Sequence, residues 1–247
     1  MHIASPETGR RVERVRYELR RREVQVARVE TIGDSFARIT FHGEELADFQ
    51  SAGFDDHIKF IFEDDNGELV RRDYTPRAFD RDKRELTLEF ALHGEGQACA
   101  WARTAKPGQR AVIGGPRGSR IVPIDYDWHL LIADDSGLPA VARRLEELPA
   151  NANIMVIAVA DAAYQTHLAS ATKVHVQWVE HADALAPAVS RLDLPGGEGF
   201  AWGAGEANAM KAVRQVLVEE KQHPTGAMRV AAYWRKGASD FHEELTE

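Results

Sequence analysis

Arg72-Asp73-Tyr74-Thr75-Pro76-Arg77 ends a strand-like run in the first half of the chain. Side chains two positions apart on a strand share a face, so Arg72 and Tyr74 point the same way. A guanidinium can donate two hydrogen bonds to one phosphate, and a phenol ring can lie flat against a planar heterocycle. Pro76 ends the strand, so the hydroxyl or N–H of Thr75 can turn toward the edge of such a ring. These contacts suit a flavin, although tracts of this kind are also common on ordinary exposed strands.

Further strand-like runs surround this tract. Including the tract's own run, six lie before residue 114, at positions 23–29, 36–41, 57–62, 69–75, 86–92 and 110–113. Turn signals such as Asp65-Asn66-Gly67 separate them, and one helical stretch, at 96–104, interrupts them. Many short strands so close together predict a small closed barrel, which we expect to be six-stranded and antiparallel.

After Asp125 the pattern changes to an alternation of strands and helices. Strands are expected at 128–133, 154–160, 174–179, 199–202 and 229–234, and helices at 138–148, 182–192 and 207–221. This alternation predicts a parallel sheet covered on both faces. We therefore predict a β-barrel domain, residues 1–124, followed by an α/β nucleotide-binding domain, residues 125–247.

Composition narrows the class of protein. The 247 residues are 44% hydrophobic and 28% charged, as in a globular protein with a real core. The net charge of −8 argues against a nucleic-acid binder. The single cysteine, Cys99, excludes an internal disulfide and an iron–sulfur cluster held by the chain's own four thiolates, so an organic cofactor has to carry any electrons. No run approaches the ~20 apolar residues of a membrane helix, so we expect a cytoplasmic protein.

The N-terminal arm is the basic exception in this acidic chain. Its arginines are Arg10, Arg11, Arg14, Arg16, Arg20, Arg21 and Arg22. A solvated arm is the simpler interpretation of such a run, and a dedicated anion site is the alternative.

Two glycine-bearing segments of the barrel half could approach a ligand closely. His93-Gly94-Glu95-Gly96-Gln97-Ala98-Cys99 opens the expected helix, whose N-terminus offers N–H groups and a positive dipole to a pyrophosphate. Gly114-Gly115-Pro116-Arg117-Gly118 closes the barrel half, where Arg117 could reach a phosphate or another anion. Both segments also read as ordinary turns that need glycine for their own geometry.

The junctions of the second half follow the expected strands. Asp134-Asp135-Ser136-Gly137 stands after the first strand, at the crevice where open α/β sheets bind nucleotides, and Ser136 is a candidate helix cap. Two carboxylates there would repel a pyrophosphate, so a dinucleotide should bind loosely or be held mainly from elsewhere. Trp202-Gly203-Ala204-Gly205-Glu206 could admit a flat ring, or its glycines could serve tight packing. Tyr233-Trp234-Arg235-Lys236 combines aromatics with cations, which suits a bulky anion or simply ends a core strand.

The order of these segments resembles the ferredoxin reductase-like flavoproteins and, among them, the siderophore-interacting proteins. The resemblance spans nearly the whole chain after residue 10. It rests on His57-Ile58-Lys59, Arg72–Arg77, His93–Gly96, Trp101-Ala102, Gly115–Gly118, Leu138-Pro139-Ala140, Ala204-Gly205-Glu206 and Tyr233–Gly237.

This resemblance implies FAD on the barrel and NADPH or NADH as electron donor. Arg72 would lie at the phosphates, Tyr74 against the isoalloxazine and Thr75 near its reactive nitrogen. The helix segment from His93 through Gly96, Gln97, Ala98 and Cys99 would take the pyrophosphate. Asp134, Ser136, Gly205, Glu206 and Trp234 would line the nicotinamide side. The chain departs from the family at Gln97-Ala98-Cys99, where a thiol replaces a better hydroxyl donor, and at Asp134-Asp135-Ser136-Gly137.

The implied substrate is a ferric siderophore, which releases iron after reduction because hard oxygen donors hold Fe(II) much less tightly than Fe(III). No general base is needed. Ferric siderophores are often anionic, so Lys59, Arg235 and Arg117 are the candidate substrate-binding cations, although Lys59 also reads as an ordinary solvated lysine.

Other interpretations remain open from the sequence alone. The same fold could serve a ferredoxin-type partner or free flavin, or the chain could be a non-enzymatic siderophore carrier. Asp161, after the second strand of the α/β half, would favour NADH over NADPH. We expect a monomer, because no long exposed apolar stripe is evident.

Overall fold

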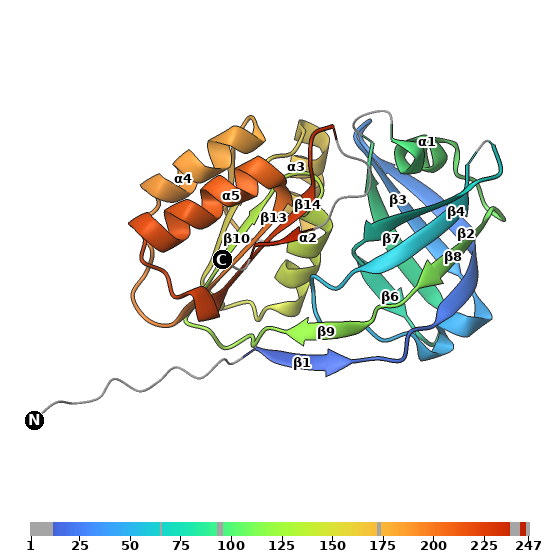
Figure 1. The fold of residues 1–247 in the computed structure, drawn as a ribbon, viewed down its shortest axis with the longest axis horizontal. Helices are drawn as coiled ribbons and strands as arrows, with labels where there is room; N and C mark the ends of the chain where they lie inside the picture. The colour runs from blue at the N-terminus through green and yellow to red at the C-terminus, as the bar shows by residue number, and fades with distance from the viewer. Residues whose placement is uncertain (1–11, 65, 93–95, 172–173, 238–242, 246–247) are drawn as a thin grey trace, which may run out of the picture.

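A computed structural model describes residues 12–64, 66–92, 96–171, 174–237 and 243–245. Two sheets stand side by side, an antiparallel one from the first half of the chain and a mostly parallel one from the second half (Figure 1). A two-stranded ribbon, β1 (Glu13–Arg16) with β9 (Gly118–Ile121), runs along one side of both. The prediction of a β-barrel followed by an α/β sheet is confirmed, and the boundary at residues 124 and 125 stays a prediction.

The antiparallel sheet contains every strand expected in the first half. Its strands, in spatial order, are β5 (Leu69–Tyr74), β4 (Ile58–Glu63), β8 (Arg110–Gly114), β2 (Arg21–Ile32), β3 (Phe36–His42), β7 (Glu85–Ala91) and β6 (Ala78–Asp80). The short β6 is an addition to the six predicted strands. Because only residues 75–77 connect β5 to β6, these two edges can lie no more than about 14 Å apart, which forces the sheet to curl.

Aromatic side chains fill the inside of this curled sheet. Phe60, fully buried on β4, lies 4.8 Å from the ring of Trp101 and 5.2 Å from that of Phe90. Trp101 belongs to α1 (Gln97–Thr104), the single expected helix, whose buried face includes Ala98, Cys99 and Ala102. Burying these rings is what holds α1 against the open end of the sheet.

The second sheet has the order β12-β11-β10-β13-β14-β15. Its strands are β10 (Trp128–Ala133), β11 (Ile154–Ala158), β12 (Val176–Trp178), β13 (Gly199–Glu206), β14 (Met228–Trp234) and β15 (Glu243–Glu244). The first five are parallel and β15 is an antiparallel edge that the sequence did not reveal. The chain runs outward from β10 to β12 and then returns to β13 on the other side of β10. This reversal places the ligand crevice between the carboxyl ends of β10 and β13.

Helices cover both faces of the parallel sheet (Figure 1). They are α2 (Leu138–Glu147), α3 (Ala162–Ala171), α4 (Leu185–Arg191) and α5 (Ala207–Gln215), which continues as a wider turn over Val216–Glu220. The sequence did not predict α3, whose apolar residues have almost no one-sided pattern. The other three helices match their predicted positions.

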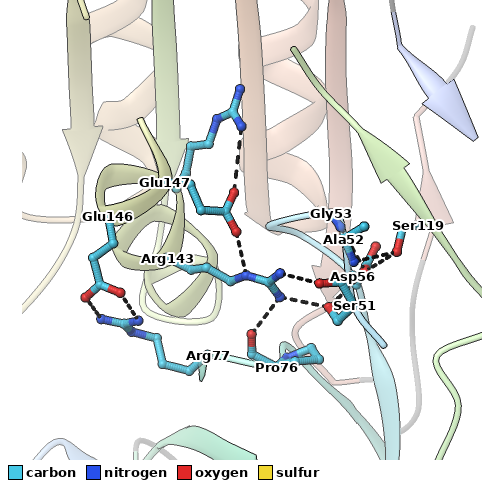
Figure 2. A network of polar contacts seen from close by, with 11 residues as sticks. Ser51, Ala52, Gly53, Asp56, Pro76, Arg77, Ser119, Arg143, Glu146 and Glu147 are labelled. Atoms are coloured by element: carbon cyan, nitrogen blue, oxygen red, sulfur yellow. Dashed lines mark hydrogen bonds and ion pairs between the residues drawn. The ribbon is translucent and has the colours of Figure 1, made fainter. Parts of the chain in front are cut away.

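Figure 2 shows how α2 binds the two halves together. Arg143 donates to the hydroxyl and carbonyl oxygens of Ser51, both at 2.8 Å, and to the carbonyl of Pro76 at 2.9 Å. Arg77 forms two bonds to Glu146, at 2.8 and 2.5 Å. The tract that ends β5 therefore also binds α2. These bonds help to fix the position of one sheet relative to the other.

Candidate functional site

The tract at the end of β5 lies beside the start of α1. In the register of the sheet Arg72 is opposite Phe60 and Tyr74 is opposite Ile58, so both share the face of the buried aromatics, as predicted. The Tyr74 ring lies 4.3 Å from that of Phe90, and burial raises the pKa of its hydroxyl. Arg72 donates to Oε1 of Gln97 at 3.2 Å. The strand end and the helix start thus form one continuous surface.

The first turn of α1 can accept an anion. Gly96 is its N-cap, and among the described residues no side chain caps the helix there. A Cβ added to Gly96 would meet no atom of these residues within 4 Å, so they leave the space in front of this turn open. The backbone N–H groups of the first turn point into that space, with the Arg72 guanidinium beside them. These residues fit a pyrophosphate. His93, also expected here, lies outside the described residues.

The thiol of Cys99 forms a hydrogen bond within the fold, unlike a hydroxyl that binds phosphate. Its thiol donates to the carbonyl of Ala91 at 3.1 Å, and burial raises its pKa. Any bond from Cys99 to a phosphate therefore has to come from its backbone N–H, and the same holds for Ala98. The thiol is thus engaged within the fold, and the weaker phosphate bond expected at Cys99 stays a prediction.

Asp134 organises the crevice at the carboxyl ends of the parallel strands. Its Oδ2 accepts from the N–H of Glu206 at 2.7 Å and from the indole of Trp234 at 2.9 Å. Its Oδ1 accepts from the N–H and hydroxyl of Ser136, at 2.9 and 2.6 Å. Asp134 is buried and ties together the ends of β10, β13 and β14. The prediction that Ser136 caps α2 is wrong, since Gly137 occupies the N-cap position without a side-chain bond.

Gly205 and Glu206, which lie beside Asp134, each have a specific structural role. A Cβ on Gly205 would lie 2.7 Å from the carboxylate of Asp134, so glycine there allows the close approach of the strand ends. Glu206 caps α5 through Oε2, which accepts from Asn208 and Ala209 at 2.6 and 3.1 Å. Its other oxygen, Oε1, is buried and has no hydrogen-bond partner among the described residues. That acceptor can receive a donor group, such as an amide N–H, from a ligand in the crevice.

Strand β14 connects the tract at the end of β5 with the residues around Asp134. Burial raises the pKa of Tyr233, and the neighbouring hydroxyl of Thr75 partly offsets this rise. The next residue, Trp234, is the one that donates to Asp134. One strand end therefore connects the β5 tract with the acidic crevice, and the sequence offered no sign of this link beyond the presence of the two aromatics.

The three candidate substrate-binding cations have separate surroundings. Lys59 lies on the outer face of β4, opposite the face of Phe60 as its alternation predicted, and pairs with Asp73 at 2.9 Å. Arg235 follows β14 and lies 3.7 Å from Glu243. Arg117 is exposed in the turn before β9.

Sequence comparison fits this geometry. Residues 126–237 match the family model described as "Siderophore-interacting protein", and residues 25–71 and 64–120 match the "Siderophore-interacting FAD-binding domain". The chain belongs to the siderophore-interacting protein family. The prediction drawn from the motifs is thereby confirmed.

Several known proteins resemble the chain over almost its whole length. The NADPH-dependent ferric-chelate reductase of Escherichia coli K12 is 36% identical, with 92% of this chain and 98% of that protein covered. The ferric vibriobactin reductase ViuB of Vibrio cholerae is 27% identical, with 90% and 93% covered. The crystal structure of a siderophore utilization protein from T. fusca superposes with a TM-score of 0.86 at 34% identity, covering 93% and 98%.

Several residues that matter to this family member were not predicted as site residues. Arg77, Arg143 and Glu89 fix the seam between the sheets, and all three are buried. Two adjacent arginines in a helix that otherwise packs against a sheet, Arg143 and Arg144, are the one sequence signal that could have indicated such a seam. No helix among the described residues is long and apolar enough to cross a membrane.

Proposed function

We propose that this protein reduces ferric siderophores and so releases their iron as Fe(II), with electrons that pass from NADPH through bound FAD. The observation that carries the proposal is the position of β14, whose Tyr233 neighbours Thr75 of the β5 tract while its Trp234 donates to Asp134 in the acidic crevice. The similarity to the NADPH-dependent ferric-chelate reductase supports it over nearly the full length of both chains.

The described residues fit FAD on the barrel side. Arg72 and the first turn of α1 would hold the phosphates, and Tyr74 and Thr75 would lie at the ring, each as a proposed role. FAD, when bound, supplies the step between the two-electron donor and iron, which takes one electron at a time. The protein itself positions the partners and needs no acid or base.

The crevice fits a loosely held nicotinamide donor. Within the part of the chain that the structure describes, Glu206 Oε1 is a buried acceptor without a hydrogen-bond partner, and Gly205, Ser136 and Trp234 surround the carboxylate of Asp134. Asp161 does not argue for NADH, because its Oδ1 accepts from the N–H of Tyr164 at 2.8 Å and so caps α3. NADPH, the donor named for the Escherichia coli relative, is therefore our choice.

The finer assignments belong to the same proposal. Lys59, Arg117 and Arg235 are proposed to attract an anionic ferric siderophore. A monomer in the cytoplasm, with domains at 1–124 and 125–247, is expected, and a ferredoxin as alternative donor would give the same flavin chemistry.

A spectroscopic experiment tests the function. Purified protein should be yellow, bleach on addition of NADPH without oxygen, and regain its colour with a ferric siderophore while a ferrous chelator turns coloured. Colourless protein that added FAD leaves unchanged would contradict the proposal and favour a carrier. Bleaching by reduced ferredoxin alone would identify the other donor.

A further inference from the structure

Two buried carboxylates lie side by side in the crevice at the carboxyl ends of the parallel strands. Asp134 is 5% exposed and Glu206 is 9% exposed. The backbone N–H of Glu206 donates to Oδ2 of Asp134 at 2.7 Å, so the two residues are in direct contact. In the part of the chain that the structure describes, no lysine, arginine or histidine forms an ion pair with either carboxylate.

Both side chains act as hydrogen-bond acceptors. Oδ1 of Asp134 accepts from the N–H of Ser136 at 2.9 Å, and Oδ2 accepts from the indole N–H of Trp234 at 2.9 Å. Acceptance at both oxygens is the role of an ionised carboxylate. Oε2 of Glu206 accepts two N–H groups in the first turn of α5, where the helix dipole favours a negative charge. Its Oε1 is buried and has no hydrogen-bond partner among the described residues.

Burial strengthens the effect of these two charges. Water screens an exposed charge, whereas a buried charge acts on its surroundings with much less screening. The N–H donors and the N-terminus of α5 carry only partial positive charges, so they offset the two negative charges in part. A ligand group with a full positive charge would therefore be attracted to this crevice more strongly than a neutral group of the same shape.

The proposed reaction produces such a group. A C–H bond of the nicotinamide ring of NADPH breaks, and the hydrogen leaves with both electrons to form a bond to a ring nitrogen of the flavin. The flavin is reduced by two electrons, and the nicotinamide ring, neutral before the transfer, keeps one positive charge as NADP⁺. The two rings have to be in contact for this step. Tyr233 of β14 neighbours Thr75, at the proposed flavin ring. The next residue, Trp234, donates to Asp134, so the carboxylates lie on the nicotinamide side of that contact.

We propose that Asp134 and Glu206 stabilise the positive charge that develops on the nicotinamide ring as the hydride leaves. This inference rests on the proposed function. The charge is absent in NADPH, partial in the transition state and complete in NADP⁺, so the two carboxylates favour the transition state and the product over the substrate. They accept no proton in this role. Fixed charges that are in place before the reaction need no rearrangement during it, which is why they accelerate the transfer.

Calorimetric titration of the oxidised, FAD-loaded protein tests the role of the charge. It compares NADP⁺ with tetrahydro-NADP, whose neutral ring cannot give a hydride. Glu206→Gln keeps the shape and an oxygen for the cap of α5 but removes the charge. The Kd for NADP⁺ should rise about tenfold, or about 1.4 kcal/mol, and that for tetrahydro-NADP less than about twofold. Glu219→Gln is the matched control, because it removes an exposed carboxylate in the wider turn that follows α5. It should bind both nucleotides as the wild type does.

Further variants separate the charge from a structural role. Anaerobic flavin bleaching at saturating NADPH should slow about tenfold in Glu206→Gln, whereas Glu206→Asp, which keeps the charge, should retain most of the rate. Asp134→Asn should weaken binding of NADP⁺ more than binding of tetrahydro-NADP, as a second test from the other carboxylate. An unchanged Kd for NADP⁺ in Glu206→Gln would overturn the proposal, and so would equal weakening of both nucleotides.

Failure of the proposed function has a different signature. Wild-type protein that neither binds NADP⁺ nor bleaches with NADPH would overturn the choice of NADPH as donor, and this inference with it. Wild-type protein that does both, beside a Glu206→Gln variant with the wild-type ratio of the two Kd values, would overturn this inference alone.

Discussion

Arg77, the last residue of the β5 tract, holds Glu146 of α2 with two parallel hydrogen bonds of 2.8 and 2.5 Å (Figure 2). Its Nε lies 3.5 Å from the buried carboxylate of Glu89, which also accepts from the hydroxyl of Tyr164 on α3 at 2.8 Å. The same arginine thus contacts acids on both sides of the seam between the sheets. The position of the proposed flavin site relative to the proposed nicotinamide site therefore depends on Arg77.

Replacing Arg77 by alanine should lower the free energy of unfolding by about 2 kcal/mol, because it removes both bonds to Glu146 and one of the two arginines beside the buried Glu89, which keeps its bonds to Arg38. Urea unfolding followed by circular dichroism measures this. Arg71→Ala is the control, since Arg71 is exposed on β5, just before the tract, and should change stability by less than about 0.5 kcal/mol. Equal losses for the two variants would refute the role given to Arg77.

The contact between the hydroxyls of Thr75 and Tyr233 should matter for the rate of electron transfer from NADPH. Tyr233→Phe should slow anaerobic flavin bleaching by about fivefold, or about 1 kcal/mol, with little change in NADPH affinity. Thr75→Val should have a similar effect. Because both changes remove the same contact, the double variant should be no slower than either single one. Additive effects in stopped-flow traces would count against a direct coupling.

Arg72 should control FAD affinity. Arg72→Lys keeps the charge but loses the fork that can hold two phosphate oxygens and the bond to Gln97. We expect the Kd for FAD, measured by flavin fluorescence, to rise about tenfold, or about 1.4 kcal/mol. Gln97→Ala should raise it less. If Arg72→Lys bound FAD as tightly as the wild type, the phosphate-binding role would belong to other residues.

Charge removal should reveal the route of the ferric substrate. Lys59→Gln and Arg235→Gln should each raise the KM for an anionic ferric siderophore severalfold and make it less sensitive to salt, while NADPH-dependent bleaching stays unchanged. Lys83→Gln, an exposed lysine paired with Asp80 on the barrel, supplies the control. An unchanged KM in both Lys59 and Arg235 variants would show that these cations do not face the substrate.

His129 should make stability depend on pH. The ring is fully buried in β10, and burial lowers its pKa to about 4. The folded protein therefore keeps this histidine neutral at pH values where the unfolded chain has already taken up a proton. Stability should fall as pH drops from about 6.5 to about 4, by at most about 3 kcal/mol from this residue. His129→Gln should flatten this part of the profile of unfolding free energy, and a profile as steep as that of the wild type would exclude His129 as the cause.

The sequence predicted the elements whose side chains repeat with a clear period. The strands of the barrel and the helices α2 and α5 follow from alternation or from an apolar stripe, since burial of one face dictates those patterns locally. It failed at α3 and at β15 and β6, where the chain is too evenly apolar or the element too short to carry a pattern. Ser136 was misjudged because Asp134 competes for it across two residues of the same loop.

The candidate site also contains some residues that the sequence indicates and others that only the tertiary structure brings together. The tract Arg72–Arg77, the glycine that begins α1 and the acids after β10 could be found by reading the chain, because spacing on a strand and the backbone needs of a turn are local properties. The contact of Thr75 with Tyr233 and the seam around Arg77 could not. Each joins residues from distant segments, and only the packing of one sheet against the other decides which side chains meet.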